Sequence, residues 1–288
     1  GYTTRSATSS QATIDVVVNN GSGSSITMSR GTKFTTTVDG TNYSFVNNAD
    51  ISISPIDGVY KFSNLDIYEG TYLNYKYTAN TTDTDQRFII PNDNVDTTTL
   101  TVKVQESSSD STTNTYKLAT GIISLDSTSK VYFLQEVENG RFEVYFGDGV
   151  LGKKLENGNK IEVSYLVTNG PETNGAKSFT FNGVVTDKFS NIGYVYNIAV
   201  DSASTVAANG GADIESLSKI KYNAPKFFST QDRAVTATDY SSIVRKIYPA
   251  ISDIIIFGGE EDDPPEYGKV KIVVKPEQAS FLSSTTKK

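Results

Sequence analysis

Apolar and polar residues alternate with a period of two along most of the chain, which is the pattern of half-buried strands. In the segment 141–146, Phe142, Val144 and Phe146 alternate with Arg, Glu and Tyr. The same pattern predicts strands at 13–18, 33–38, 42–46, 50–54, 59–62, 71–78, 87–90, 99–104, 116–118, 130–136, 161–167, 178–181 and 188–200. An abundance of Thr, Ser, Val, Ile and Tyr supports strands over helices.

Glycine-containing turns interrupt the segment 141–170 twice. Asp-Gly and Asn-Gly pairs favour hairpin turns, because glycine readily adopts a positive φ. We therefore predict a rigid hairpin made of the strands 141–146 and 161–167, whose chemistry is backbone geometry and not reactivity. The structural turn residues of this hairpin are Gly147, Asp148, Gly149, Gly152, Asn157 and Gly158.

The same glycines allow a second interpretation, a phosphate-binding loop. Gly147, Gly152 and Lys153 have the spacing G-x-x-x-x-G-K directly after a predicted strand. Such a loop needs a Ser or Thr after the lysine and a helix whose N-terminus faces the phosphate. Lys154 follows instead, and the next segment has the pattern of a turn and a strand. The turn interpretation is favoured.

A helical period replaces the strand period after the glycines at 209–211. Ile214 and Leu217 have helical spacing in 213–221, so we predict a helix with Asp213 as its N-cap and an end at Pro225. Thr236-x-x-Asp239 is a capping box and predicts a second helix. The apolar stripe of this second helix is Tyr240, Ile243, Val244, Ile247 and Tyr248, and Pro249 ends it.

Two strands are expected after the helices, at 253–257 and 269–275, with Ile243 and Ile247 covering one face of their sheet. The acidic residues 260–263 lie between these strands and could bind a divalent cation, although a solvated loop is favoured. Asp83 and Asp85 are spaced as in some calcium loops, but the Gly and the distal Glu of such loops are missing. We expect a linker there and no metal site.

These patterns divide the chain into three expected domains. They are an antiparallel β domain at 1–84, a β domain with the hairpin at 85–208, and an α+β domain with two helices and a β hairpin at 209–288. The predicted fold is mainly β with an α+β C-terminal part, in which antiparallel β domains precede a helix–helix–strand–strand unit. The chain starts without Met and ends in a polar TTKK, so we expect a fragment with a truncated last domain.

Composition narrows the possible chemistry. The net charge of −7 and the pI of about 4.8 argue against a nucleic-acid-binding face. Cys and His are both absent, which excludes disulfides, thiolate metal sites, Ser-His-Asp triads and histidine zinc sites. No apolar run approaches the ~20 residues of a membrane span, and no signal peptide is visible. We expect no cofactor, no small-molecule substrate and no membrane contact.

Two segments together resemble the baseplate J-like family of contractile-tailed phages, most closely its ring-forming baseplate wedge subunits from T-even phages. One is 146–170, and the other is 210–257. The matching positions of the second segment are, in order, Gly210-Gly211, Glu215-Ser216, Ala224-Pro225, Arg233-Ala234-Val235-Thr236 and Asp239-Tyr240. The resemblance covers about 88–276, whereas 1–82 resembles the family only diffusely.

The resemblance implies a structural virion protein of the tail baseplate, assembled in the host cytoplasm. Its copies would form homodimers and close into a ring around the hub. That ring would join the wedges, contact other wedge subunits and relay the change of baseplate shape on infection. The family brings no catalytic residues, so we expect no enzyme. Most Tyr and Phe residues are expected in the core, and the candidates for subunit contacts are Tyr222, Phe227, Phe228 and Tyr248.

Two other function classes remain open. A carbohydrate-binding or adhesin-like β module would fit the strands rich in Thr, Ser, Asn and Tyr and the acidic pI, but it leaves the C-terminal helices unexplained. A glycosidase would need two carboxylates facing each other across a cleft, and sequence alone cannot pair them.

Overall fold

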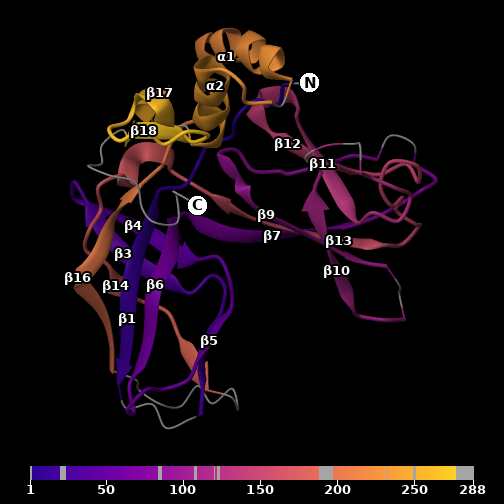
Figure 1. Cartoon of the computed structure of the whole chain (residues 1–288). Coiled ribbons are helices and arrows are strands. Elements are labelled where there is room, and N and C mark those ends of the chain that lie inside the picture. The colour runs from indigo at the N-terminus through magenta and orange to yellow at the C-terminus, as the bar shows by residue number, and fades with distance from the viewer. Residues whose placement is uncertain are drawn as a thin grey trace. The chain divides into compact units, whose positions relative to one another are not determined.

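The computed structural model describes residues 2–19, 24–83, 86–106, 109–119, 121, 124–187, 197–231, 233–248 and 251–276 (Figure 1). Their contacts form two compact units. Unit 1 contains Tyr2 and the described parts of 8–71 and 169–288, and unit 2 contains 3–7 and the described parts of 72–168. Each unit is described below by itself.

Unit 1 is built on a six-stranded sheet and a three-stranded sheet. The larger sheet has the order β14-β3-β4-β6-β1-β16, and the smaller one has the order β15-β2-β5. Their strands are β1 (Gln11–Asn19), β2 (Ile26–Met28), β3 (Lys33–Val38), β4 (Thr41–Asn47), β5 (Ile51–Ile53), β6 (Tyr60–Glu69), β14 (Thr180–Phe181), β15 (Val185–Asp187) and β16 (Asn197–Asn209). The alternation in β1 places Ile14, Val16 and Val18 in a core shared with Ile26 and Met28 of β2.

The strand β16 returns to β1 from far along the sequence and pairs with it antiparallel from Asn19 to Gln11. The predicted strand 188–200 is therefore present from Asn197, and 188–196 lie outside the described residues. Each of the two compact units combines segments that are distant in sequence. The units therefore differ from the expected division of the chain into consecutive domains at 84 and 208. That three-domain division stays a prediction.

Unit 2 is built on a seven-stranded sheet with the order β7-β13-β9-β10-β11-β12-β8. Its strands are β7 (Thr71–Thr78), β8 (Phe88–Ile89), β9 (Val95–Gln105), β10 (Thr113–Leu118), β11 (Val131–Glu136), β12 (Phe142–Phe146) and β13 (Lys160–Val167). The short pair β10–β11 is parallel, whereas the pairs β9–β10, β9–β13, β11–β12 and β8–β12 are antiparallel. The core includes Val102 and Val104 of β9 against Ile161 and Val163 of β13.

The predicted hairpin of 141–146 with 161–167 is wrong, although both strands exist. β12 pairs with β11 and β8, whereas β13 pairs with β9, so three strands separate them in the sheet. Alternation predicts which residues form a strand and which face is apolar, but it does not choose the neighbour. The choice is made by the long-range match of Ile161 and Val163 to Val104 and Val102.

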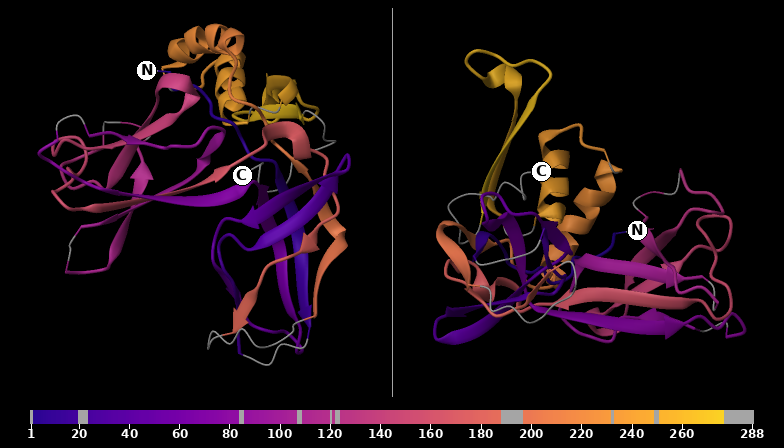
Figure 2. Two further views of the ribbon diagram at one scale, coloured as in Figure 1. Left: turned by 180° about the vertical axis from the view of Figure 1, so that it is seen from behind. Right: turned by 90° about the horizontal axis from the view of Figure 1, so that it is seen from below.

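The C-terminal part of unit 1 has two helices and then two strands, as the sequence predicts. They are α1 (Leu217–Thr230), α2 (Ala237–Ile247), β17 (Ile251–Gly258) and β18 (Val270–Pro276). The 3₁₀ turns are η1 (Glu138–Gly140), η2 (Gly170–Thr173) and η3 (Gly259–Glu261). In the right-hand view of Figure 2 the β17–β18 hairpin projects as a long ribbon beyond the helices. Within the described residues, none of the helices has the length and apolarity that crossing a membrane requires.

The two helix predictions differ in outcome. The capping box of α2 is present, since Thr236 accepts from the Asp239 amide and Asp239 accepts from the Thr236 amide. The predicted limits of α1 are wrong. The cap is Ser216, whose side chain accepts from the Lys219 amide, and the helix passes through Pro225 to Thr230. A proline in a helix removes one amide donor, and α1 nevertheless continues for five residues beyond Pro225.

Candidate functional site

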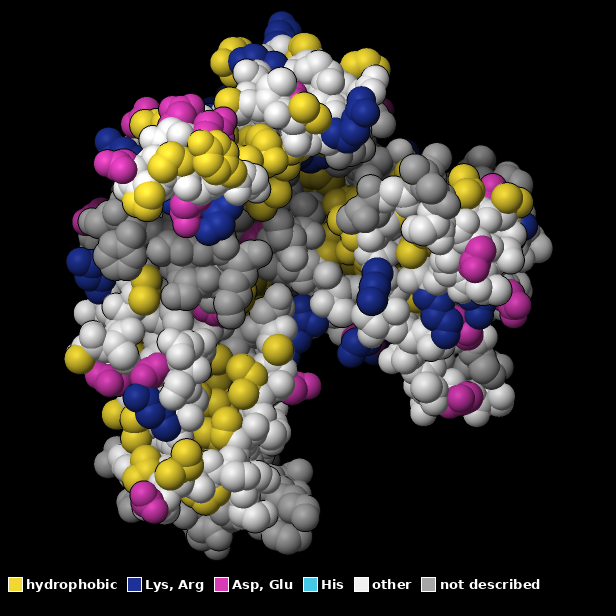
Figure 3. Space-filling view, in the orientation of Figure 1, with side chains coloured by type: hydrophobic (Ala, Val, Ile, Leu, Met, Phe, Trp, Pro, Cys, Tyr) yellow, Lys and Arg dark blue, Asp and Glu magenta, His cyan; other side chains and the backbone are white. Residues whose placement is uncertain are grey.

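The C-terminal helices and hairpin expose many large apolar side chains. We define the C-terminal apolar surface by these residues: Leu217, Tyr222, Phe228, Val235, Ile247, Ile255, Tyr267, Val270, Ile272 and Val273. Figure 3 shows hydrophobic side chains gathered over the hairpin and the helices at the top of the view. The helix α2 has no buried residue, and Thr230 is the buried residue of α1. This surface is therefore the strongest candidate for an interaction site.

The hairpin is apolar on both faces. β17 contains the consecutive apolar residues Ile254, Ile255 and Ile256, so alternate side chains point to opposite faces of the ribbon. Ile254 and Ile256 line a shallow groove with residues of α1 and α2. Ile255 pairs across the strands with Val273, and their side chains are 63% and 52% exposed. Strands with continuous apolar runs are usually covered on both faces.

Two of the four residues predicted from sequence as subunit contacts are exposed on α1. The side chain of Phe228 is 78% exposed, and that of Tyr222 is 63% exposed. The Lys226 ammonium lies 3.4 Å from the centre of the Tyr222 ring. The hydrogen bond and the charge of Lys226 lower the pKa of the Tyr222 phenol.

The other two predicted contacts, Phe227 and Tyr248, take part in interactions within unit 1. The Phe227 ring meets the Tyr2 ring edge-on at 5.8 Å between centroids, and the Lys246 ammonium lies 3.6 Å from the Phe227 centroid. The Tyr248 hydroxyl donates to Asn209 Oδ1 at 3.1 Å. These contacts hold the helices in place, and they leave the subunit-contact role of both residues as a prediction.

Sequence reasoning missed Glu215, which anchors the start of α1. Its side chain is buried, and the Tyr2 hydroxyl lies 2.8 Å from both carboxylate oxygens. Asn223 Nδ2 donates to Oε1 of the same carboxylate at 2.7 Å. A buried carboxylate is costly unless it accepts hydrogen bonds, which Tyr2 and Asn223 supply. A Glu directly before the cap Ser216 was the available signal, but its partner Tyr2 is distant in sequence.

The prediction that Ile247 covers the sheet is wrong. Ile247 is the last residue of α2, and its side chain is 74% exposed. Because α2 ends at Ile247, the apolar stripe of this helix does not extend over the hairpin beyond that residue. Ile243 is half-buried, and α2 contacts β17. Arg245 also donates to the Ile251 carbonyl at 3.4 Å.

The glycine turns predicted from sequence lie in the loop between β12 and β13. Gly149 and Gly152 have φ of 93° and 90°, and a Cβ on Gly147 would lie 2.2 Å from the Gly152 carbonyl carbon. The Asp148 carboxylate accepts from the Val150 and Leu151 amides at 2.8 and 2.9 Å, which lowers its pKa. Gly147 therefore permits a backbone approach that no other residue allows.

Lys153 and the second turn also have protein partners. Lys153 Nζ lies 2.7 Å from Glu106 Oε2, and the chain continues into β13 and not into a helix. This geometry removes the phosphate-loop interpretation. At the second turn Gly158 has φ of 85° and donates to the Ala79 carbonyl at 2.7 Å, and Asn157 accepts from the Thr81 amide.

The acidic loop of the hairpin uses carboxylates in ion pairs. Lys271 Nζ lies 2.8 Å from both Asp262 Oδ2 and Glu266 Oε2, and these hydrogen bonds raise the pKa of Lys271. Within the part of the chain that the structure describes, no group of three or more His, Cys, Asp or Glu residues is placed to hold a metal ion. Asp85 lies outside the described residues.

Comparisons with known proteins match two segments of the chain. Residues 75–177 match the family "Bacteriophage baseplate wedge protein gp6, third domain", which includes nearly all of unit 2. Residues 236–288 match "Baseplate structural protein gp6, C-terminal domain I", beginning at the cap of α2.

A curated relative gives the same result over a longer stretch. The chain is 30% identical over 176 residues to "Baseplate wedge protein gp6" of Enterobacteria phage T4. The matched part is 55% of this chain and 26% of the relative, so the chain spans only about a quarter of the relative's length. Both domain matches and this identity agree, and the chain belongs to the gp6 baseplate wedge protein family.

Proposed function

We propose that this chain is a structural part of a contractile-tail baseplate and acts through contacts with copies of itself and with other wedge subunits. In this proposal the copies form dimers, close into a ring that joins the wedges around the hub, and relay the change of baseplate shape. The protein works in the virion after assembly in the host cytoplasm, without catalysis. Membership of the gp6 family supports the baseplate assignment.

The C-terminal apolar surface carries the self-association part of the proposal. Exposed apolar area of this density is typical of protein interfaces, because water is released when a partner covers it. Tyr222 and Phe228 contribute rings on α1, and Ile255 and Val273 contribute the outer face of the hairpin. Phe227 and Tyr248 are the other two candidates for subunit contacts, and within unit 1 they contact Tyr2 and Asn209.

Sedimentation equilibrium of the purified chain tests this proposal. We expect reversible dimers, and we expect Phe228→Ser and Ile255→Ser each to raise the dimer dissociation constant by about tenfold or more, as at interface hot spots. Val150→Ser in unit 2 is the matched control, since Val150 is also mostly exposed. Circular dichroism should show unchanged folding in all three variants. A wild-type monomer, or equal dimerisation in all variants, would contradict self-association through this surface.

A further inference from the structure

One strand inside the large sheet of unit 1, β6, is paired along only part of one of its two sides. β4 pairs with β6 only through Phe45 to Asn47, opposite Glu69 to Ile67. After Asn47 the chain bends away and continues as β5, which pairs with β2 in the smaller sheet. β1 pairs with β6 as far as Tyr60. Among the described residues, the stretch of β6 before Ile67 therefore pairs with a strand on one side only.

The backbone of Asp66 faces the vacated position. Glu69 donates its amide to the Ser10 carbonyl, on the β1 side of β6. Backbone groups alternate in direction along a strand, so Tyr68 and Asp66 face the other side. Tyr68 is opposite Val46 of β4, whereas Asp66 lies one pair beyond the end of the β4–β6 ladder. A strand placed there would continue the line of β4.

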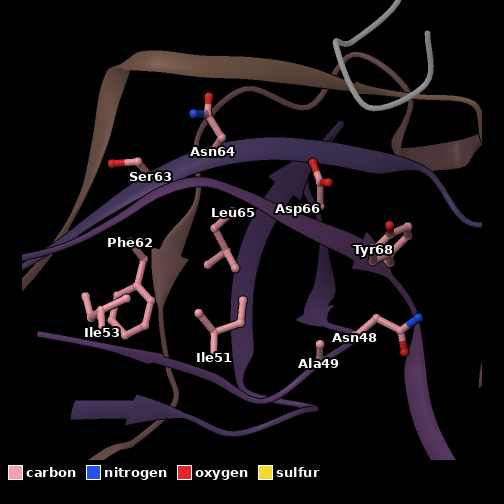
Figure 4. A pocket seen from close by; sticks show the side chains of 10 residues that line it. All are labelled: Asn48, Ala49, Ile51, Ile53, Phe62, Ser63, Asn64, Leu65, Asp66 and Tyr68. Atoms are coloured by element: carbon pink, nitrogen blue, oxygen red, sulfur yellow. The ribbon is translucent and has the colours of Figure 1, made fainter. Parts of the chain in front are cut away.

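A groove of about 410 Å³ occupies this position (Figure 4). Its size falls in the range of ligand-binding clefts. Figure 4 shows Ile51, Ile53, Phe62 and Leu65 facing one another as an apolar floor, and Ser63 and Asn64 pointing away from it. The rim is completed by Asn48, Ala49, Asp66 and Tyr68.

The groove has the chemistry of a strand-binding site. Phe62 and Leu65 of the floor are buried, whereas Ser63 and Asn64 between them are exposed, because a β-bulge interrupts the two-residue period of β6 at this point. Every second side chain of a guest strand would insert between Phe62 and Leu65 of β6 and Ile51 and Ile53 of β5. Asp66 is the charged residue among the lining residues, and its Oδ1 accepts from Thr13 on the outward face. A cationic side chain on the outward face of the guest would complement it.

We propose that this groove binds an extended peptide segment of another protein, which adds to β6 as a strand in the place that β4 vacates. The segment carries apolar side chains at alternate positions and Lys or Arg between them. Main-chain hydrogen bonds to β6 provide affinity, and the floor and Asp66 provide selectivity. This site is separate from the C-terminal apolar surface.

Peptide titration tests the proposal directly. The probe is acetyl-Lys-Val-Lys-Val-Lys-Val-Trp-amide, whose fluorescence is selective because the chain has no Trp. We expect saturable binding and slower amide hydrogen exchange at Asp66. The same peptide with N-methylated amides at alternate positions keeps its side chains but loses pairing donors, and it should not bind.

Two variants locate the site without altering the core. Ala49→Phe adds a ring at an exposed rim position and should abolish binding. Asp66→Lys should weaken binding by about fivefold through like charges across the strands. Glu260→Lys makes the same charge change on the exposed hairpin loop and should have no effect. Thermal melting should confirm that all three variants fold.

The remaining outcomes separate this proposal from its alternatives. Absence of peptide binding, or equal binding by the N-methylated peptide, would overturn it. Binding of maltohexaose or chitohexaose in place of the peptide, lost in Ala49→Phe, would assign the groove to a glycan. A lower mass of Ala49→Phe in sedimentation would assign it to a second copy. Phe228→Ser should leave peptide binding unchanged, so failure of the dimer proposal would not affect this result.

Discussion

The pair β9–β13 in unit 2 and the hairpin β17–β18 in unit 1 place the same types of aliphatic residue in opposite surroundings. Both are antiparallel pairs rich in Val and Ile. Val102 and Ile161 in the first pair are fully buried, whereas Ile255 and Val273 in the second are more than half exposed. Both pairs are antiparallel, but other side chains cover these residues only in the first pair.

Because their surroundings differ, the aliphatic side chains of the two pairs make different contributions to the stability of the folded chain. Burying an aliphatic side chain stabilises the folded state by about 1.5–3 kcal/mol relative to leaving it in water. The β9–β13 pair gains this stabilisation within the chain. The outer face of the hairpin gains it only when a partner covers Ile255 and Val273. The β9–β13 pair therefore uses these aliphatic residues for folding, whereas under the proposed function Ile255 and Val273 serve association.

The largest expected effect is at the buried pair. Ile161→Ala should lower the free energy of unfolding by about 2–5 kcal/mol, because it removes buried methyl groups and leaves a cavity. Ile255→Ala in the hairpin is the matched substitution and should change the free energy of unfolding of the isolated chain by less than about 0.5 kcal/mol. Urea unfolding followed by circular dichroism measures both. Similar losses in the two variants would remove the distinction between these regions.

The next effect concerns the loop that leaves β12 in unit 2. Gly147→Ala should destabilise the chain by about 1–3 kcal/mol, since the new Cβ would collide with the Gly152 backbone. Gly121→Ala is the control, because Gly121 has open space around it and an ordinary φ. Thermal melting of both variants checks the prediction. If Gly147→Ala left the melting temperature unchanged, the loop would be able to relax around the added Cβ. Unit 2 would then be less rigid than its buried core suggests.

Much of the fold could be predicted from the sequence because local patterns determine local structure. The hairpin β3–β4 turns at Asp39-Gly40, a pair that favours hairpin turns, and α2 begins at its capping box, since both features depend on residues close together in sequence. The pairings β12–β11, β13–β9 and β16–β1 could not be predicted. Each of these depends on complementary strands that no local signal connects.

The candidate site was predictable in part for the same reason. Tyr222 and Phe228 are among the four aromatic residues predicted from sequence as subunit contacts, and both are exposed. The packing of Phe227 against Tyr2 and the role of Glu215 depend on a segment about two hundred residues away in sequence. The groove beside β6 has no sequence signal, because it arises where β4 leaves one sheet and β5 joins another.

A smaller effect is expected at the start of α2. Because α2 buries no side chain, its cap should contribute a larger share of its local stability than a cap on a buried helix. Thr236→Ala should cost about 1 kcal/mol through loss of the bond to the Asp239 amide. Thr238→Ala inside the helix is the control and should be neutral or slightly stabilising. Amide exchange in α2 distinguishes the two, and equal exchange would show that contacts with β17 hold the helix.

The smallest effect is the acid response of the same helix. Amide hydrogen bonds from Thr236 lower the pKa of Asp239, so its stabilising contribution is complete above the ordinary aspartate pKa of about 3.9 and is lost as the pH falls through the lower folded value. In unit 2, hydrogen bonds from Ser129 and Thr128 lower the pKa of Asp126 to about 2. Carboxyl chemical shifts measured by NMR should show Asp126 titrating near 2. Faster amide exchange in α2 should begin only below about pH 4, and Asp239→Asn should remove this pH dependence. An α2 that loosens equally at acidic pH in Asp239→Asn would mean that a group other than the cap controls it.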